Sequence, residues 1–242
     1  MPNKFSGFPA EGLSFFRQLK RNNNREWFQE RKHIYDEKLR APMEAMVEAI
    51  NAELAKSAPD YVTEPKKAVY RIYRDTRFSK NKEPYKTHIA AIFTKRSLPR
   101  HQAGALYFHV SAEEIVVAGG VYMPDPPALL KLRNHLADHH AQLNALLKAK
   151  PARQLAGDLH GESLSRPPKG FPADHPAIDL LKKKQWYFDV NMPPQSATKP
   201  TFAKEIIKRF QAMLPVVEFL NAPLAAKKPA ALEAGKNSPR MR

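Results

Sequence analysis

Residues 66–86 concentrate the side chains best suited to binding a charged ligand. Eight Lys and Arg residues stand there against two acids, and four aromatic residues lie between them. Guanidinium and ammonium groups bind phosphate or carboxylate oxygens, and the planar fork of arginine does so through paired hydrogen bonds. We therefore expect an anion site made of Arg71, Arg74, Arg77, Lys82 and Lys86, drawn together at one hollow, with Tyr85 and Arg166 at its rim.

The local sequence pattern predicts the secondary structure that holds these cations. Residues 69–73 are rich in β-branched and aromatic types, which favours an extended strand with Arg71 and Tyr73 on one face. Residues 78–82 read as a loop. Two other interpretations stay open: a solvated strand face, or an internal ion-pair network in which Arg71 or Arg74 meets Asp75 and carboxylates from helices.

Histidines are the second group able to do chemistry. His109 shares a strand face with Tyr107 and Ser111, and it is our candidate proton-transfer group if that face carries the anion site. His135 and His139 have the i, i+4 spacing of a two-histidine metal clamp, but no Glu stands between them. A half-buried histidine is the better interpretation there, so we expect neither a metal nor a cofactor.

The elements that must position these groups indicate a single α+β domain over residues 1–222. Strands are expected at residues 89–93, 105–111, 114–122 and 186–190, with a tight turn at residues 112–113. They form an antiparallel meander packed against N-terminal, central and C-terminal helices. Gly119 and Gly120 predict a bulge or a close backbone approach. The helices are expected over residues 13–19, 25–39, 43–54, 125–150, 178–184 and 201–220, and residues 223–242 read as a basic, disordered tail.

Composition limits the class of protein and its partners. Hydrophobic residues make up 43% of the 242 residues, and the chain has no cysteine and a formal charge of +16. No stretch approaches the roughly 20 apolar residues that a membrane span needs, and the start lacks an apolar leader, so we expect a cytoplasmic protein that does not bind membranes. The charge favours polyanionic partners. An anionic or phosphorylated small molecule is the leading hypothesis, and non-catalytic nucleic-acid binding or a structural, partner-binding role are the alternatives.

Several segments together resemble a known family. They are residues 71–79, which read RIYRDTRFS, and residues 82–87, 107–111, 119–124, 166–172 and 175–176. In combination they are similar to the family called domain of unknown function 2461, found in bacteria and fungi, over roughly residues 5 to 221. The resemblance implies one domain of mixed α and β character. Because the family has no assigned activity, it supplies no catalytic residue, and the sequence leaves open whether the protein is an enzyme.

Overall fold

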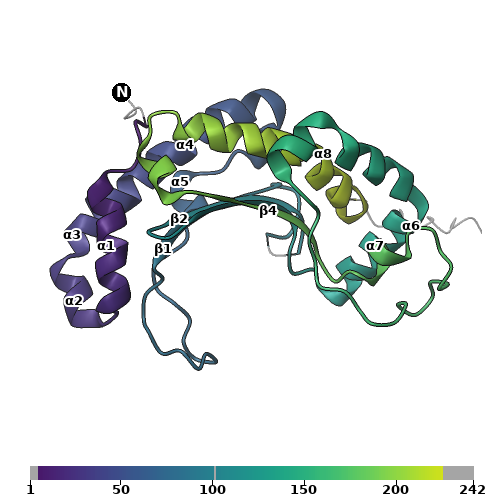
Figure 1. Cartoon of the computed structure of the whole chain (residues 1–242), viewed down its shortest axis with the longest axis horizontal. Coiled ribbons are helices and arrows are strands. Elements are labelled where there is room, and N and C mark those ends of the chain that lie inside the picture. Colours follow the sequence, from purple (N-terminus) through teal and green to yellow (C-terminus); the bar gives the residue numbers. More distant parts are fainter. Residues whose placement is uncertain (1–4, 101, 226–242) are drawn as a thin grey trace, which may run out of the picture.

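The computed structural model describes residues 5–100 and 102–225, which form an α+β fold around one antiparallel sheet (Figure 1). Four strands lie side by side in the order of the chain: β1 (His88–Thr94), β2 (Ala105–Ser111), β3 (Ile115–Val121) and β4 (Trp186–Met192). The predicted meander is therefore confirmed, and the turn between β2 and β3 falls where it was expected. Within the described residues no helix is both long and apolar enough to cross a bilayer.

Helices flank the sheet in three groups. The N-terminal group is α1 (Ala10–Arg21), α2 (Arg25–Glu30), α3 (Lys32–Tyr35), the π-helical turn η1 (Asp36–Arg40), α4 (Ala41–Ser57), the 3₁₀ turn η2 (Pro59–Tyr61) and α5 (Pro65–Ala68). The central group is α6 (Pro126–Lys148), the π-helical turn η3 (Ala152–Ala156) and α7 (Ile178–Lys182). The C-terminal group is the 3₁₀ turn η4 (Pro194–Thr198) and α8 (Phe202–Ala225).

The core lies on one face of the sheet. Alternate residues of β1, Ile89, Ala91 and Phe93, are buried there, and α8 packs across β2 and β3 while α4 contacts β1. In Figure 1 the sheet is arched, and α4 and α8 lie over its convex side. The opposite, concave side is flanked by α1–α3 at one end and α7 at the other. Side chains alternate along a strand, so the residues between the buried ones face the concave side, which α4 and α8 leave uncovered.

Local signals explain several element boundaries. Asn24 caps α2 by accepting a hydrogen bond from the Trp27 backbone N–H at 2.9 Å, and Asp125 caps α6 through the Ala128 N–H at 2.9 Å. The apolar stripe of α4, which includes Met43, Met46 and Ile50, is fully buried. These side-chain caps and the helix-period stripe are features that the sequence predicts directly.

The helix predicted over residues 25–39 is interrupted at Arg31, and two further predicted elements differ clearly from the structure. Residues 69–73 form only isolated bridges, Val69 to Ala91 and Tyr73 to Tyr85, because the chain leaves the sheet after one bridge and pairs with itself. The helix expected over residues 201–220 continues to Ala225, since the last turns are anchored by the buried Leu220 and Asn221. The expected tail boundary at residue 223 thus falls inside α8, and residues 226–242 of that tail lie outside the described part of the chain.

Candidate functional site

A cavity of about 890 Å³ lies on the uncovered face of the sheet. All four strands contribute alternate residues to it, and the register places these residues in rows that cross the strands. One such row is Ile92, Tyr107, Ala118 and Asp189. The volume is within the range of about 300–1,000 Å³ that is usual for small-molecule sites.

Small residues form the floor of this cavity. Ala90, Ala105, Ala118 and Gly120 line it, each from a different point on β1, β2 or β3. Gly120 has a φ of 135°, and a Cβ atom there would lie 2.2 Å from the Trp186 carbonyl oxygen. The close backbone approach predicted at this glycine is therefore confirmed. Because the middle of the sheet carries such short side chains, the floor is low and flat between two taller ends.

Two cations, Lys86 and Arg100, stand over the ring of Tyr70 at the β1 edge of the cavity. The Lys86 Nζ lies 5.2 Å and the Arg100 Cζ 5.6 Å from the ring centroid. Backbone carbonyls hold both groups, since Lys86 donates to the Arg71 oxygen at 3.0 Å and Arg100 to the Lys67 oxygen at 2.8 Å. Burial, followed by the nearby Arg71 charge, lowers the pKa of Lys86. We call Lys86, Arg100 and Tyr70 the cationic end.

Two histidines lie beside the cationic end. His88 and His109 project from β1 and β2 with their ring centroids 4.8 Å apart, and the Tyr107 hydroxyl lies 3.1 Å from His109 Nδ1. Burial lowers the pKa of both imidazoles, that of His88 to about 4 with further contributions from His109 and Lys86. Burial also raises the pKa of the Tyr107 phenol. At neutral pH these groups are uncharged, so they can accept or donate hydrogen bonds and exchange protons with a bound molecule.

The opposite end of the cavity has different chemistry. Tyr122 and Tyr187 meet edge to face with centroids 5.1 Å apart, and Asp189 of β4 lines the wall beside them. The Asp189 carboxylate lies 3.4 Å from the Nε2 of His160. We call Tyr122, Tyr187 and Asp189 the aromatic–acidic end. The cavity thus has positive charge at one edge of the sheet and a carboxylate at the other.

Of the residues predicted to bind a ligand, Lys86 lies in this cavity together with His109. Arg71 lines a smaller cavity of about 190 Å³ between α2, α3 and the segment that follows α5. The remaining predicted residues line neither cavity: Arg74, Arg77, Lys82, Tyr85 and Arg166. The structure therefore distributes these cations over two cavities and two loops, one that holds Arg74, Arg77 and Lys82 and one before α7 that holds Arg166.

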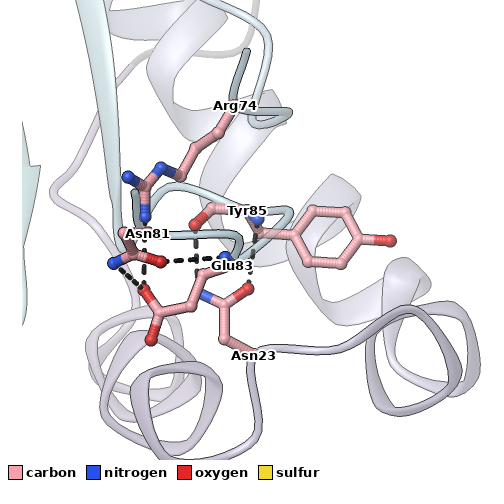
Figure 2. A network of polar contacts seen from close by, with 5 residues as sticks. All are labelled: Asn23, Arg74, Asn81, Glu83 and Tyr85. Carbon is pink, nitrogen blue, oxygen red and sulfur yellow. Dashed lines mark hydrogen bonds and ion pairs between the residues drawn. The ribbon is translucent and has the colours of Figure 1, made fainter. Parts of the chain in front are cut away.

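The loop that holds Arg74 is organised by its own polar contacts, which Figure 2 shows. Arg74 donates to Glu83 at 3.2 Å, and Asn81 donates to the same carboxylate at 2.9 Å. The amide of Asn23 hydrogen-bonds both the backbone N–H and C=O of Tyr85, at 3.1 and 3.0 Å. These contacts bind the base of the loop to the turn between α1 and α2, and they direct the Arg74 guanidinium toward an acid of its own loop.

The other predicted residues are also engaged locally. Arg77 makes two hydrogen bonds to the Asp75 carboxylate, at 3.0 and 2.7 Å, and Lys82 donates to the Thr76 oxygen at 3.0 Å. Tyr85 is only 2% exposed and stacks on Phe28 with centroids 4.1 Å apart, so it belongs to the core rather than to a rim. Arg166 is exposed on the loop before α7. A neighbouring acid therefore accounts for the position of Arg77, and core packing accounts for that of Tyr85.

Several residues of the site were not singled out from the sequence, among them Arg100, His88 and Asp189. The strand alternation could have found His88, because it shares a face with Ala90 and Ile92 and is diagonal to His109 across β1 and β2. Asp189 could have been found in the same way on β4. Arg100 has no such signal, since it lies in the connection after β1 and reaches the site only through the path of that connection.

His135 and His139 of α6 pack against each other and against α8 instead of forming a metal-binding cluster with carboxylates. The ring centroids of His135 and His139 lie 4.7 Å apart, and His135 packs on Phe219 of α8 at 4.5 Å. Burial and the neighbouring His139 lower the pKa of His135. Among the described residues, no group of three or more His, Asp or Glu side chains is arranged to hold a metal ion.

Comparison with known proteins places the chain in a family but not with a characterised relative. Searches of curated proteins and of solved structures gave no match. A family model described as "Conserved hypothetical protein (DUF2461)" matches residues 11–219, which include every strand and both ends of the cavity. The chain therefore belongs to the DUF2461 family of conserved hypothetical proteins.

Proposed function

We propose that this protein binds a small anionic molecule, such as a phosphate ester, on the uncovered face of its sheet. The observation that carries the proposal is the cationic end, where Lys86 and Arg100 line a cavity beside two neutral imidazoles. The lining carboxylates, Asp125 and Asp189, come from the α6 cap and from β4 rather than from the β1 edge. An anion at the cationic end would meet two positive charges and several hydrogen-bond donors.

The state of Lys86 supports the same conclusion. Its ammonium group is partly buried and near the like charge of Arg71, and both conditions lower its pKa. A bound anion would offset both effects, because an opposite charge within about 4–6 Å favours the charged form. Arg100 offers a planar guanidinium, which suits the oxygens of phosphate. His109 and His88 are the groups at this end that can move a proton to or from the bound molecule.

Binding of inorganic phosphate and phenyl phosphate, measured by titration calorimetry on the full chain, tests this proposal. We expect Lys86→Met and Arg100→Met each to weaken both ligands by about tenfold or more, because hydrogen bonds to charged groups contribute about 1.5–3 kcal/mol. Phenyl phosphate should bind more tightly than phosphate, since its ring would cover the apolar floor.

Arg77→Met is the matched control, because it removes a cation that is 76% exposed and already paired with Asp75. It should leave both affinities unchanged. The proposal fails if neither compound binds the wild-type protein, or if Arg77→Met weakens binding as much as Lys86→Met does.

Nucleic-acid binding is a second candidate, favoured by one feature of the loop. Phe78 is 94% exposed, and the Arg77 guanidinium lies 5.7 Å from its ring centroid. An exposed aromatic ring among cations is suited to stacking on an unpaired base. If the loop binds single strands, Phe78→Ala should weaken an oligonucleotide complex by about fivefold or more, and affinity should fall steeply with salt. A salt-independent affinity, or no effect of Phe78→Ala, would dismiss this candidate.

A further inference from the structure

The two ends of the large cavity differ in a way that selects a ligand with two different ends. We propose that the cavity binds a mononucleotide lengthwise, with its phosphate at the cationic end and its base at the aromatic–acidic end. This inference rests on the anion site proposed above and adds the class of molecule that the site accepts. It follows from the spacing of the two ends, the shape of the floor and the chemistry of Tyr122, Tyr187 and Asp189.

The sheet register gives the spacing. Tyr107 of β2 packs against Tyr70 of the cationic end, with ring centroids 6.3 Å apart, and it lies in one row with Ala118 of β3 and Asp189 of β4. Neighbouring strands are about 4.8 Å apart, so the backbone positions of Tyr107 and Asp189 are separated by roughly 10 Å. A ligand that contacts both ends must therefore be longer than an isolated phosphate. Its second recognition group must lie two strands away from the first.

The floor suits a flat molecule between the ends. Ala118 and Gly120 project almost nothing from β3, and Gly120 cannot take a larger residue because a Cβ would collide with the Trp186 carbonyl. On the strands that flank β3, the larger side chains of Tyr107, His109 and Tyr187 also line the cavity. A sugar ring can lie over the strip without displacing a side chain.

The aromatic–acidic end matches a base better than it matches a second anion. Tyr122 is 58% exposed, an unusual state for a large aromatic residue, and its edge-to-face contact with Tyr187 holds the ring at the cavity wall. Such a ring is a stacking surface for a base. Asp189 beside it is a hydrogen-bond acceptor, and adenine, guanine and cytosine each carry an amino group that donates to such an oxygen.

Charge fixes the direction of binding. A phosphate near Asp189 would be repelled, whereas at the cationic end it meets Lys86 and Arg100. An amino group at the cationic end would face Lys86 and Arg100, whose side chains only donate, although the neutral imidazoles and the Tyr107 hydroxyl there can accept. The reversed orientation therefore places the phosphate beside a carboxylate and gives the amino group no charged acceptor, so the ligand has one preferred direction.

The test compares AMP, UMP, ribose 5-phosphate, adenosine and inorganic phosphate by titration calorimetry with the full chain. AMP should bind at least tenfold more tightly than ribose 5-phosphate, because stacking a base on an aromatic ring contributes about 1–3 kcal/mol. It should also bind more tightly than UMP, whose base has no amino group. Adenosine should bind much more weakly than AMP.

Variants at the aromatic–acidic end separate this inference from the anion site. Asp189→Asn and Tyr122→Ala should each weaken AMP by about tenfold or more while the affinity for inorganic phosphate stays the same. Tyr122→Phe keeps the ring and should bind AMP like the wild type. Asp174→Asn is the matched control, since this exposed carboxylate lies in the loop before α7 and outside both cavities.

The outcomes distinguish the two proposals. The nucleotide inference is overturned if AMP, ribose 5-phosphate and phosphate bind with equal affinity. It is also overturned if neither Asp189→Asn nor Tyr122→Ala changes the affinity for AMP. The anion site still stands in that case, provided that Lys86→Met and Arg100→Met weaken all three phosphates. If no phosphate compound binds, or adenosine binds as well as AMP, the anion site is refuted and the nucleotide inference with it.

Discussion

Replacing His88 with glutamine should make the protein less sensitive to acid. His88 is held neutral in the folded state because burial, His109 and Lys86 together lower its pKa to about 4. In the unfolded chain the same side chain titrates near 6.5. Glutamine is similar in size, remains uncharged at every pH and keeps a hydrogen-bonding group in the cavity. The substitution therefore removes one proton-binding site from the unfolded state with little change in shape.

The sign and size of the effect follow from these two pKa values. Between pH 6.5 and pH 4 the unfolded state binds the proton and the folded state does not, so the free energy of unfolding falls as the pH drops. For a histidine with these values the loss between pH 7.5 and pH 5 is about 2 kcal/mol. Below about pH 4 the folded state is protonated as well, and the contribution of His88 levels off.

Urea denaturation at pH 7.5 and pH 5, in a buffer without phosphate, measures this difference. The wild type should lose about 2 kcal/mol more than His88→Gln between the two pH values. His33→Gln is the control, because His33 is exposed on α3 and lines neither cavity. Equal losses in the wild type and His88→Gln would refute the view that His88 is kept neutral by its surroundings.

Two further substitutions test the polar contacts described above. Asn221→Ala should lower the free energy of unfolding by about 3 kcal/mol, because this buried amide bonds both the N–H and C=O of Gly104 and donates to the Tyr61 hydroxyl; a loss under 1 kcal/mol in urea would contradict this. Arg74→Ala should cost less than about 1 kcal/mol in the same assay and leave phosphate affinity unchanged, since its partner Glu83 is 45% exposed. A large loss of stability would instead indicate a structural ion-pair network.

Much of the architecture could be predicted from the sequence because it depends on short-range patterns. Alternation placed His109 and Tyr107 on one face of a strand, and both line the cavity. The short polar turn after Ser111 gave the hairpin, and Gly119-Gly120 marked the close approach of β3 and β4. The apolar stripes gave the helices. The sequence signal for each of these features lies within about ten residues, although the strand that approaches Gly120 is distant in the chain.

The content of the site was decided by tertiary structure. Alternation shows which residues of β1 share a face, but Ala90 and Ile92 are as apolar as the buried Ala91, so the pattern does not tell which face α4 and α8 cover. Arg100 reaches the site through the path of an irregular connection. Tyr85 was expected at a rim but stacks on Phe28, some 57 positions earlier in the chain.

A count of cations therefore identified a basic segment but not the cations that a ligand would meet. Arg74 and Arg77 look equivalent to Lys86 in composition, yet the Arg74 guanidinium pairs with Glu83 and that of Arg77 pairs with Asp75. Lys86 lies two residues before β1, and its side chain lines the cavity on the uncovered face of the sheet. The sequence by itself determined that positive charge is concentrated in this segment. Only the folded structure decided which of these charges remain available, because ion pairing and burial depend on neighbours in space.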